Sequence, residues 1–468
     1  MKDKVKYYNG SQLSIEDYLQ ENTLETEDNV EVPSILSVSE LNEVDTKPLS
    51  NVILERILSR DNMNMAYKRV KANKGAGGID GMTVNELLPF LKENGNKIKE
   101  SIRKKKYNPK AVRRVEIPKP DGSKRKLGIP TVVDRVIQQA VAQELSRIYE
   151  PMFSDRSYGF RPKRSCHDAI RKVEEIVNRG YTWVVDIDLE KFFDTVNHDL
   201  LISIIRRTIN EDKVVSLIRK YLQAGVLENG LFRRTERGTP QGGNISPILS
   251  NIMLNELDQE LEGRGLEFVR YADDLEIFVK SEKAARRVLE SVTRYIETKL
   301  KLKVNRDKSK IDRPWRTKYL GFSFFRKEGK VRIRVHEKSI KRLKDKIRKI
   351  TGRRKAKTML QRFKELRQLL TGWYNYFKLA ELKRVARDID GWIRRRLRMC
   401  YWKQWKKPWT KYTNLKKLGI RGREAWLSAK SSKNYWRMAQ TPIINKAISN
   451  KVLKEAGFIS LTDLMGAY

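Results

Sequence analysis

Hydrophobic and polar positions follow different patterns in successive parts of the chain. Residues 1–50 are polar and acidic without a sustained apolar period, which predicts a weakly ordered N-terminal extension. Between residues 51 and 325, short apolar segments typical of strands alternate with apolar positions at helical spacing. From residue 326 onward the helical spacing prevails, and most intervening positions are basic. The pattern therefore predicts an α/β (α+β) fold with a mixed region followed by an α-helical region.

Individual elements can be placed from the same pattern. Apolar residues at helical spacing over Val52–Leu58 predict one helix, and Asp61 is a candidate cap for a second helix that ends near Asn73. The loop Gly75–Gly81 lacks the Lys-Ser/Thr that ends a nucleotide-binding P-loop, so it predicts a simple chain reversal. The other expected elements are strands at 112–117, 126–129 and 181–188, helices at 132–149 and 166–179, and a hairpin over 266–279.

The region beyond residue 330 combines helical spacing with many basic residues. Near residues 340–350, one apolar stripe consists of Ile340, Leu343, Ile347 and Ile350. Because few acids balance the rest of this helix, phosphate contact is favoured over a merely solvated face. The candidate nucleic-acid-binding residues there are Lys341, Arg342, Lys344, Arg348 and Lys349. Seven of the nine tryptophans lie between Trp373 and Trp436, and we expect most of them to be core residues.

Net charge also indicates a nucleic-acid partner. The chain carries 99 Lys+Arg against 58 Asp+Glu, a formal net charge of +41. Residues 1–50 hold 11 acids and 4 bases, whereas residues 326–420 hold 33 bases and 7 acids. The positive charge is therefore concentrated in the helical region, where it attracts a polyanion and repels a basic partner.

Composition excludes several other classes of protein. With 39% apolar residues the body of the chain is expected to fold. Apolar runs such as Trp183–Val185 are far too short to cross a bilayer, and no signal-peptide pattern opens the chain. Two cysteines, Cys166 and Cys400, are too few for a zinc framework. These features predict a cytoplasmic nucleic-acid protein.

The sharpest chemical feature is the pair Asp273-Asp274 at the tip of the predicted hairpin. Adjacent carboxylates repel each other, and a divalent cation such as Mg²⁺ supplies a counter-charge with oxygen ligands. Asp188, at the end of a predicted buried strand, is a natural third carboxylate for a two-metal site. Asp186 competes with Asp188, because strand alternation places both side chains on one face. Taken alone, the pair is also consistent with an exposed turn.

Short motifs follow one another along the chain in a definite order. They are Lys74–Met82, Ile117–Gly122, Leu127–Thr131, Tyr158–Pro162, Asp188–Asp194, Gly238–Pro247, Tyr271–Asp274, Leu302–Lys308 and Tyr319–Phe322. Each motif is weak by itself, but the ordered set is specific. The set resembles the group II intron reverse transcriptase/maturase family of the bacterial type, over roughly residues 50–440.

The resemblance implies a right-hand polymerase and assigns roles to single residues. Fingers and palm are expected over 51–325, an α-helical thumb and maturase domain over 326–410, and a basic DNA-binding segment over 411–468. Asp188, Asp273 and Asp274 are implied to be catalytic and metal-binding. Asp188 is preferred to Asp186 because an aromatic residue stands five positions later, where the family keeps a gate against a ribose 2′-hydroxyl. The nucleotide-binding residues implied by the resemblance are Lys119, Arg125, Phe193, Gln241 and Lys308.

Roles for these residues follow from their chemistry within the family pattern. Lys119 and Arg125 are expected to hold the triphosphate, and Gln241 to contact the incoming nucleotide. Lys308 is expected to protonate the leaving pyrophosphate. For the three cationic residues, an ordinary surface ion pair is the plain alternative.

The function implied by the resemblance is RNA-directed DNA polymerase encoded by a group II intron. Such a protein also binds the intron RNA to assist splicing and copies it into DNA during retrohoming. The expected partners are the intron RNA, an RNA template/DNA primer duplex, target DNA and deoxynucleotides, with no membrane. The expected cofactor is Mg²⁺ in a two-metal site, with Mn²⁺ as a substitute.

Several points stay open at the level of sequence. One alternative is a reverse transcriptase co-opted for DNA repair or phage defence without a cognate intron. Another is an RNA-binding splicing factor with a non-essential polymerase. No cysteine follows Cys400 and the last histidine is His336, so the HNH-type endonuclease of many relatives is expected to be absent. A bacterial, nucleoid-associated location is expected, and a dimer is one option for the oligomeric state.

Overall fold

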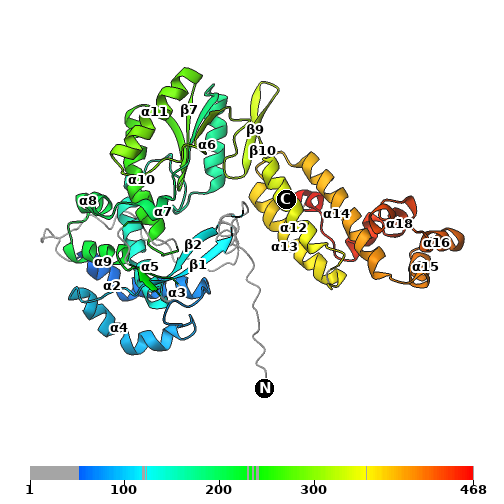
Figure 1. Cartoon of the computed structure of the whole chain (residues 1–468), viewed down its shortest axis with the longest axis horizontal. Helices are drawn as coiled ribbons and strands as arrows, with labels where there is room; N and C mark the ends of the chain where they lie inside the picture. Colours follow the sequence, from blue (N-terminus) through cyan, green and yellow to red (C-terminus); the bar gives the residue numbers. More distant parts are fainter. Residues whose placement is uncertain are drawn as a thin grey trace. The chain divides into compact units, whose positions relative to one another are not determined.

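The computed structural model of the chain describes residues 52–466, apart from 119–121, 123, 229–230, 234–236, 239–241 and 355. These residues form two compact units (Figure 1), called unit 1 (52–313) and unit 2 (314–466). The mixture of helices and sheets confirms the expected fold class. The units divide between Arg313 and Pro314, earlier than the expected boundary after residue 325. The expected N-terminal extension lies outside the described residues, as do Lys119 and Gln241.

Unit 1 is organised around helix α5 (Val132–Tyr149), which is buried along most of its length because apolar residues lie on every side of it. Helices α2, α3 and α10 pack directly against α5. Helices α4, α7, α8, α9 and α11 complete the same hydrophobic core, whereas the buried residues of α6 lie outside it and α6 packs against β6. The bounds of the unit 1 helices other than α5 are α2 Val52–Leu58, α3 Arg60–Ala72, α4 Leu87–Arg103, α6 Cys166–Asn178, α7 Phe192–Thr195, α8 His198–Thr208, α9 Asp212–Leu222, α10 Ser246–Gly263 and α11 Glu282–Thr298.

A four-stranded sheet with the order β6-β7-β3-β8 carries the carboxylates of interest. Its strands are β3 (Trp183–Ile187), β6 (Glu267–Tyr271), β7 (Asp274–Val279) and β8 (Lys310–Asp312). Every neighbouring pair is antiparallel. Helices α6 and α10 contact β6, and α11 contacts β3, β7 and β8. These helices cover the apolar positions of the sheet, so only its strand ends are left to carry chemistry.

A second sheet, with the order β2-β1-β4-β5, forms another part of unit 1. Its strands are β1 (Val112–Pro118), β2 (Lys124–Ile129), β4 (Val226–Glu228) and β5 (Leu231–Arg233). Strands β1 and β2 form an antiparallel hairpin, and β1 pairs in parallel with β4. Through this sheet, two distant parts of the sequence meet, because Val112 and Arg113 at the start of β1 pair with Val226 and Leu227 of β4.

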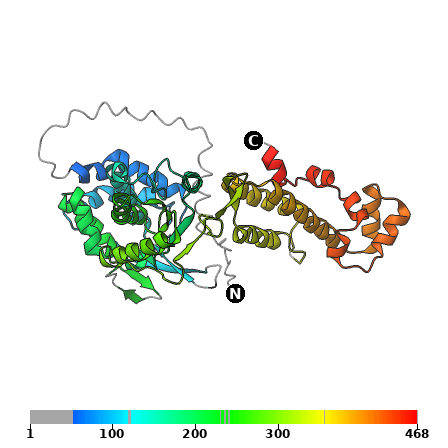
Figure 2. The ribbon, with the colours of Figure 1, turned by 90° about the horizontal axis from the view of Figure 1, so that it is seen from above.

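Unit 2 begins with a β-hairpin and continues as helices only, as Figure 2 shows in yellow to red. Asp390 on α14 accepts backbone hydrogen bonds from Leu461 (2.8 Å) and Thr462 (2.9 Å), so the last segment returns along α14. No helix among the described residues is long and apolar enough to cross a membrane. The elements are β9 Phe322–Lys327, β10 Lys330–Val335, α12 Glu337–Ile350, α13 Met359–Phe377, α14 Lys383–Gln404, α15 Pro408–Lys417, α16 Gly422–Ala429, α17 Tyr435–Met438, α18 Pro442–Ala447, α19 Asn450–Glu455 and α20 Leu461–Gly466.

Most elements predicted from periodicity are present within a few residues of their expected bounds. Strands β1, β2 and β3, helices α5, α6 and α12 and the β6–β7 hairpin confirm the pattern. The expected cap of α3 is wrong: Ser59, not Asp61, accepts the hydrogen bond from the backbone N–H of Asn62. The serine is better placed because a capping side chain must precede the first helical residue.

Candidate active site

The strand register places two of the candidate aspartates side by side. In the pairing of β3 with β7, Asp186 lies opposite Glu276 and Ile187 lies opposite Leu275. One residue further along, Asp188 follows the end of β3 and Asp274 begins β7. Strand alternation then directs both carboxylates to the same face of the sheet. Asp273 stands in the turn directly before Asp274.

The turn that carries the pair is held in an unusual backbone conformation. Ala272 has a φ of +57°, in the left-handed region that a tight two-residue turn requires. The neighbouring loop approaches closely here, since a Cβ atom added to Gly159 would lie 2.2 Å from the backbone nitrogen of Ala272. Tyr158 donates its backbone N–H to the carbonyl of Arg270 at 2.9 Å. The glycine of the motif Tyr158–Pro162 is therefore required so that this loop can support the turn.

The buried guanidinium of Arg270 holds the same turn in place through hydrogen bonds. Arg270 and Asp258 are 1% and 0% exposed and form a two-pronged ion pair, with N–O distances of 2.7 and 2.5 Å. The Arg270 guanidinium also donates to Asn251 Oδ1 at 3.0 Å and to the carbonyl of Ala272 at 2.9 Å. Asn251 in turn donates to the carbonyl of Gly159 at 2.9 Å. This network could not be predicted from the sequence, because its arginine lies on β6 and its acid on α10, and only the fold brings them together.

The third aspartate is held by the segment that follows α11. Asp188 donates its backbone N–H to Ser309 Oγ at 3.0 Å, and its carbonyl accepts from Asn305 at 2.8 Å. Lys308 Nζ lies 3.8 Å from Asp188 Oδ2, although the lysine side chain is 64% exposed. The structure thus brings Lys308 to the candidate site, with an ammonium group that still faces solvent.

The segment that contains Phe193 contacts the motif Gly238–Pro247. Phe193 is half-buried and its ring meets that of Phe192 edge to face at a centroid distance of 5.3 Å. A Cβ atom on Gly238, which has a φ of +90°, would lie 2.7 Å from the carbonyl oxygen of Phe193. On Gly242 it would lie 2.5 Å from the carbonyl oxygen of Gly128 on β2. The glycines of the motif thus allow it to lie against both α7 and β2.

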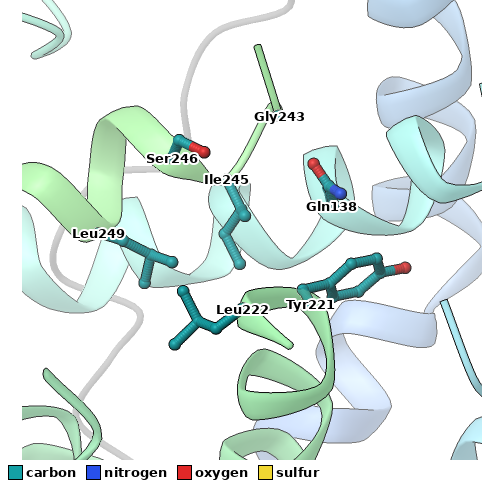
Figure 3. Close-up of a pocket in the computed structure, with 7 residues that line it drawn as sticks. All are labelled: Gln138, Tyr221, Leu222, Gly243, Ile245, Ser246 and Leu249. Atoms are coloured by element: carbon teal, nitrogen blue, oxygen red, sulfur yellow. The ribbon is translucent and has the colours of Figure 1, made fainter. Parts of the chain in front are cut away.

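The end of this motif is anchored in the core of unit 1. Figure 3 shows a small pocket where Ile245 and Ser246, at the start of α10, face α5 and the end of α9. The other labelled residues are Gln138, Tyr221, Leu222, Gly243 and Leu249. Asn244 donates to Gln139 Oε1 at 3.0 Å. The pocket is a packing feature and lacks the size and polar groups of a nucleotide site.

The electrostatics of the site favour a bound cation. Burial raises the pKa of the Asp273 carboxyl, and the nearby charge of Asp188 raises it further, while Arg125 and Arg270 oppose the shift. Among the described residues, no three His, Cys, Asp or Glu side chains are gathered into a ready-made metal site. Asp188, Asp273 and Asp274 still fit a divalent ion, because their side chains offer only hard oxygen donors.

A second pair of carboxylates, Asp186 and Glu276, lies on the same face of the sheet, two residues further into β3 and β7 than Asp188 and Asp274. Burial raises the pKa of Asp186 to about 6, and Asp188 adds to the shift while Lys310 opposes it. Glu276 is 1% exposed, and burial raises its pKa well above the usual range, with Asp186 and Asp274 adding to the shift. In the part of the chain that the structure describes, neither Glu276 oxygen has a hydrogen-bond partner. Asp188, directly after β3, is 36% exposed, whereas Asp186 is the more enclosed carboxyl. The assignment of Asp188 rather than Asp186 as the metal ligand stays a prediction.

The raised pKa of Asp186 predicts a stability effect with a definite sign. A carboxyl with a folded-state pKa of about 6 and an unfolded value of 3.8 destabilises the fold when ionised. This free-energy cost is absent below the unfolded-state pKa. It grows as the pH rises from the unfolded-state pKa to the folded-state pKa, and it is complete above a pH of about 6. We expect Asp186→Asn to stabilise the metal-free protein by on the order of 2 kcal/mol at pH 7.5.

Urea denaturation of the wild type and the variant at pH 5 and pH 7.5 measures this effect. The gain should shrink at pH 5, where the wild-type carboxyl already holds its proton. Asp61→Asn, which removes an exposed aspartate from α3, is the matched control and should change stability little at either pH. A gain for Asp186→Asn that is equal at both pH values would contradict the assignment.

The candidate nucleic-acid-binding residues all lie on α12 in unit 2. Leu343 and Ile347 form its buried stripe, as predicted. Arg348 forms an ion pair with Asp345 and its guanidinium lies 5.5 Å from the ring centroid of Trp392. This arginine therefore has partners within the protein, which weakens its case as a phosphate ligand. The remaining candidates are the exposed Lys341, Arg342 and Lys349 and the half-buried Lys344.

Comparison with known proteins connects this geometry to a family. Residues 117–324 match the family described as "Reverse transcriptase (RNA-dependent DNA polymerase)", and residues 340–419 match "Group II intron, maturase-specific domain". The first match contains all three candidate aspartates, and the second contains all the candidate phosphate ligands of α12.

Individual relatives agree with the two domain matches. The chain is 38% identical over 280 residues to Protein YkfC of Escherichia coli (strain K12), covering 51% of this chain and 74% of that protein. It is 32% identical over 368 residues to the group II intron-encoded protein LtrA of Lactococcus lactis subsp. cremoris, covering 62% of this chain and 61% of LtrA. A chain of the solved "Partial Cas6-RT-Cas1--Cas2 complex" is 24% identical over 53% of this chain and 42% of that chain, with a TM-score of 0.35. From the two domain matches and the sequence similarity to YkfC and LtrA, we conclude that the chain belongs to the group II intron reverse transcriptase/maturase family.

Proposed function

We propose that the chain copies a group II intron RNA into DNA with two divalent metal ions, Mg²⁺ or Mn²⁺, held by Asp188, Asp273 and Asp274. The observation that carries the proposal is the meeting of these aspartates at one end of the β6-β7-β3-β8 sheet. The supporting contact is Lys308 Nζ, 3.8 Å from Asp188. The reverse transcriptase match over residues 117–324 supplies the reaction class.

The chemistry divides between the metals and the side chains of this chain. When bound, the metal ions activate the primer 3′-hydroxyl and neutralise the charge that develops on the phosphates. Lys308 donates a proton to the leaving pyrophosphate, and its exposed ammonium group is free to reach it. Arg125 holds the triphosphate, which its effect on Asp273 supports by placing a positive charge beside the site. Lys119 and Gln241 complete the nucleotide contacts in this proposal.

The second part of the proposal assigns RNA binding for splicing to unit 2. The maturase-specific match over residues 340–419 supports this role. Exposed lysines and arginines of α12 contact the phosphates of the intron RNA, which is read chiefly through its backbone and shape. The template–primer duplex and the target DNA are further partners, and association with the nucleoid follows from them.

Sugar selection provides a direct test of the polymerase. The Phe193 ring closes the space beside the 2′ position of the incoming nucleotide, so Phe193→Ala should admit a ribose. We expect the variant to incorporate ribonucleotides at least about ten-fold better, relative to deoxynucleotides, than the wild type. Single-nucleotide extension of a DNA primer on an RNA template measures the ratio.

Phe153→Leu is a useful control, because Phe153 is 6% exposed in the core and its ring packs on Tyr149, whereas the ring in contact with Phe193 is that of Phe192. Its ratio should match the wild type even if its stability falls. If Phe193→Ala left the ratio unchanged, Phe193 would not be the gate. If the wild type did not extend the primer with any divalent metal, the proposed polymerase function would be lost.

A further inference from the structure

Large aromatic side chains gather on the outside of the α15–α16 hairpin in unit 2. Trp409 is 67% exposed and Trp426 is 37% exposed, whereas Trp373 and Trp402 are buried as expected for core residues. Burying a tryptophan removes a large apolar surface from water and stabilises a fold, so an exposed tryptophan gives up much of that stabilisation. The hairpin lies at one end of unit 2, beyond the end of α14, in both Figure 1 and Figure 2.

The two exposed rings are joined by the half-buried ring of Tyr412 into a continuous row. The Trp409 and Tyr412 ring centroids are 5.3 Å apart with an interplanar angle of 37°. Tyr412 and Trp426 are 5.6 Å apart and nearly perpendicular, at 86°. Lys430 Nζ lies 4.5 Å from the centroid of the Trp426 ring. The row Trp409–Tyr412–Trp426 is called the aromatic row below.

The aromatic row stands in a strongly positive surrounding. Residues 403–437 contain eleven lysines and arginines and one acid, Glu424. Lys406, Lys407 and every residue up to Thr410 are exposed, so the chain leading to Trp409 is fully open to solvent. A protein-binding patch is normally apolar at its centre and depleted of lysine. Exposed aromatic rings interleaved with lysine instead match a surface on which bases stack and phosphates are neutralised.

We propose that the aromatic row binds unpaired bases of the RNA, with Trp409 as the outer stacking residue and the surrounding lysines on the phosphates. A double helix cannot occupy the row in this way, because its base faces are already stacked. RNA is favoured over DNA because Trp409 and Tyr412 lie within the maturase-specific match over residues 340–419. Tyr412, Trp426 and Lys430 also lie in the segment 411–468, for which the sequence predicts DNA binding, so single-stranded DNA of the same length is the competing probe. The inference rests on the proposed function for the identity of that RNA.

Binding of short oligomers by the full chain tests the proposal without any polymerase chemistry. The probe is a dye-labelled single-stranded RNA of about twelve nucleotides, followed by anisotropy at several salt concentrations. Trp409→Ala should weaken binding on the order of ten-fold and leave the salt slope unchanged, because it removes stacking and no charge. Lys416→Ala with Lys417→Ala should instead lower the slope, by about 0.7 for each phosphate that is no longer neutralised.

Three further comparisons identify the occupant. An oligomer of the same backbone without bases should bind the wild type and Trp409→Ala equally. Trp409→Leu, which keeps apolar area but no ring, should fail as Trp409→Ala does, whereas Trp409→Phe should recover part of the affinity. Leu360→Ala is the control for loss of an exposed apolar side chain, because Leu360 is 76% exposed and lies on α13, outside the aromatic row. This variant should bind the RNA with the affinity of the wild type.

Each adverse result has a distinct meaning. If Trp409→Ala weakened binding of the oligomer without bases as much as binding of the ordinary RNA, Trp409 would not stack on bases. That result would overturn the proposal. A loss confined to single-stranded DNA would also overturn it. A change in oligomeric mass of Trp409→Ala without RNA would identify the row as a protein interface. Primer extension by Trp409→Ala on a preformed template–primer reports on the proposed polymerase separately, so failure of one assay does not imply failure of the other.

Discussion

Replacing Asp273 and Asp274 together by alanine should abolish cDNA synthesis while leaving protein-assisted splicing largely intact. The proposed metal site would lose two of its three carboxylates, and loss of several kcal/mol of transition-state stabilisation corresponds to a rate decrease on the order of 10³-fold or more. In the proposed function, splicing assistance depends on the cationic surface of unit 2 and on RNA shape, neither of which includes these two residues. Primer extension on a generic RNA template and splicing of the cognate intron at low Mg²⁺ measure the two activities in parallel.

Two controls make the comparison specific. Asp61→Ala with Glu93→Ala removes two acidic side chains from unit 1 as well, both of them exposed, so it shows any general tightening of RNA binding. As the second control, we neutralise five residues of α12 together, Lys341, Arg342, Lys344, Arg348 and Lys349, which should weaken both activities. The slope of log affinity against log salt concentration should also become shallower, by about 0.7–0.9 for each phosphate left without its cation. If the aspartate double variant folded correctly but lost splicing as completely as synthesis, the two functions would not be separable as proposed.

The parts of the fold that rest on local pattern could be predicted from the sequence. The buried strand β3, the hairpin tip and the helix α12 each carry a period or turn signal within about fifteen residues. The proximity of Asp188 and Asp274 could not be predicted in this way, because the two residues are 86 positions apart and local periodicity does not show which strands pair. Resemblance to a known order of motifs supplied that step, and the register of β3 with β7 now gives it a physical basis.

What the sequence could not predict is where charged residues are buried. Glu276 alternates with Leu275 and Ile277 as an outward-facing residue would, yet it is 1% exposed. Arg270 looks like a solvent-facing residue of β6, but its partner on α10 makes it a buried support for the catalytic turn. Helix α10 covers this strand, and that coverage depends on tertiary packing rather than on sequence spacing. The exposed Trp409 is the converse case, since apolar character alone predicts burial.

The buried pair Arg270–Asp258 should be the most sensitive structural feature of the site. Breaking a buried ion pair by removing one partner typically costs about 3–5 kcal/mol. The two single variants should differ in a predictable way. Asp258→Leu leaves a guanidinium that cannot lose its proton, whereas Arg270→Met leaves a carboxyl whose pKa burial already raises, so it can become neutral. We expect Asp258→Leu to be the more destabilising change and the cost of Arg270→Met to grow with pH.

The double variant Asp258→Leu with Arg270→Met separates stability from catalysis. Replacing both charges by apolar side chains should recover much of the lost stability, because no unpaired charge is left in the core. It should not recover DNA synthesis, because the turn still lacks the guanidinium that donates to Asn251 and to the carbonyl of Ala272, next to Asp273. Urea denaturation and single-turnover primer extension measure the two properties on the same samples. Recovery of both together would mean that Arg270 stabilises the fold without positioning the turn, whereas stable but inactive protein would establish it as the positioning residue for the catalytic aspartates.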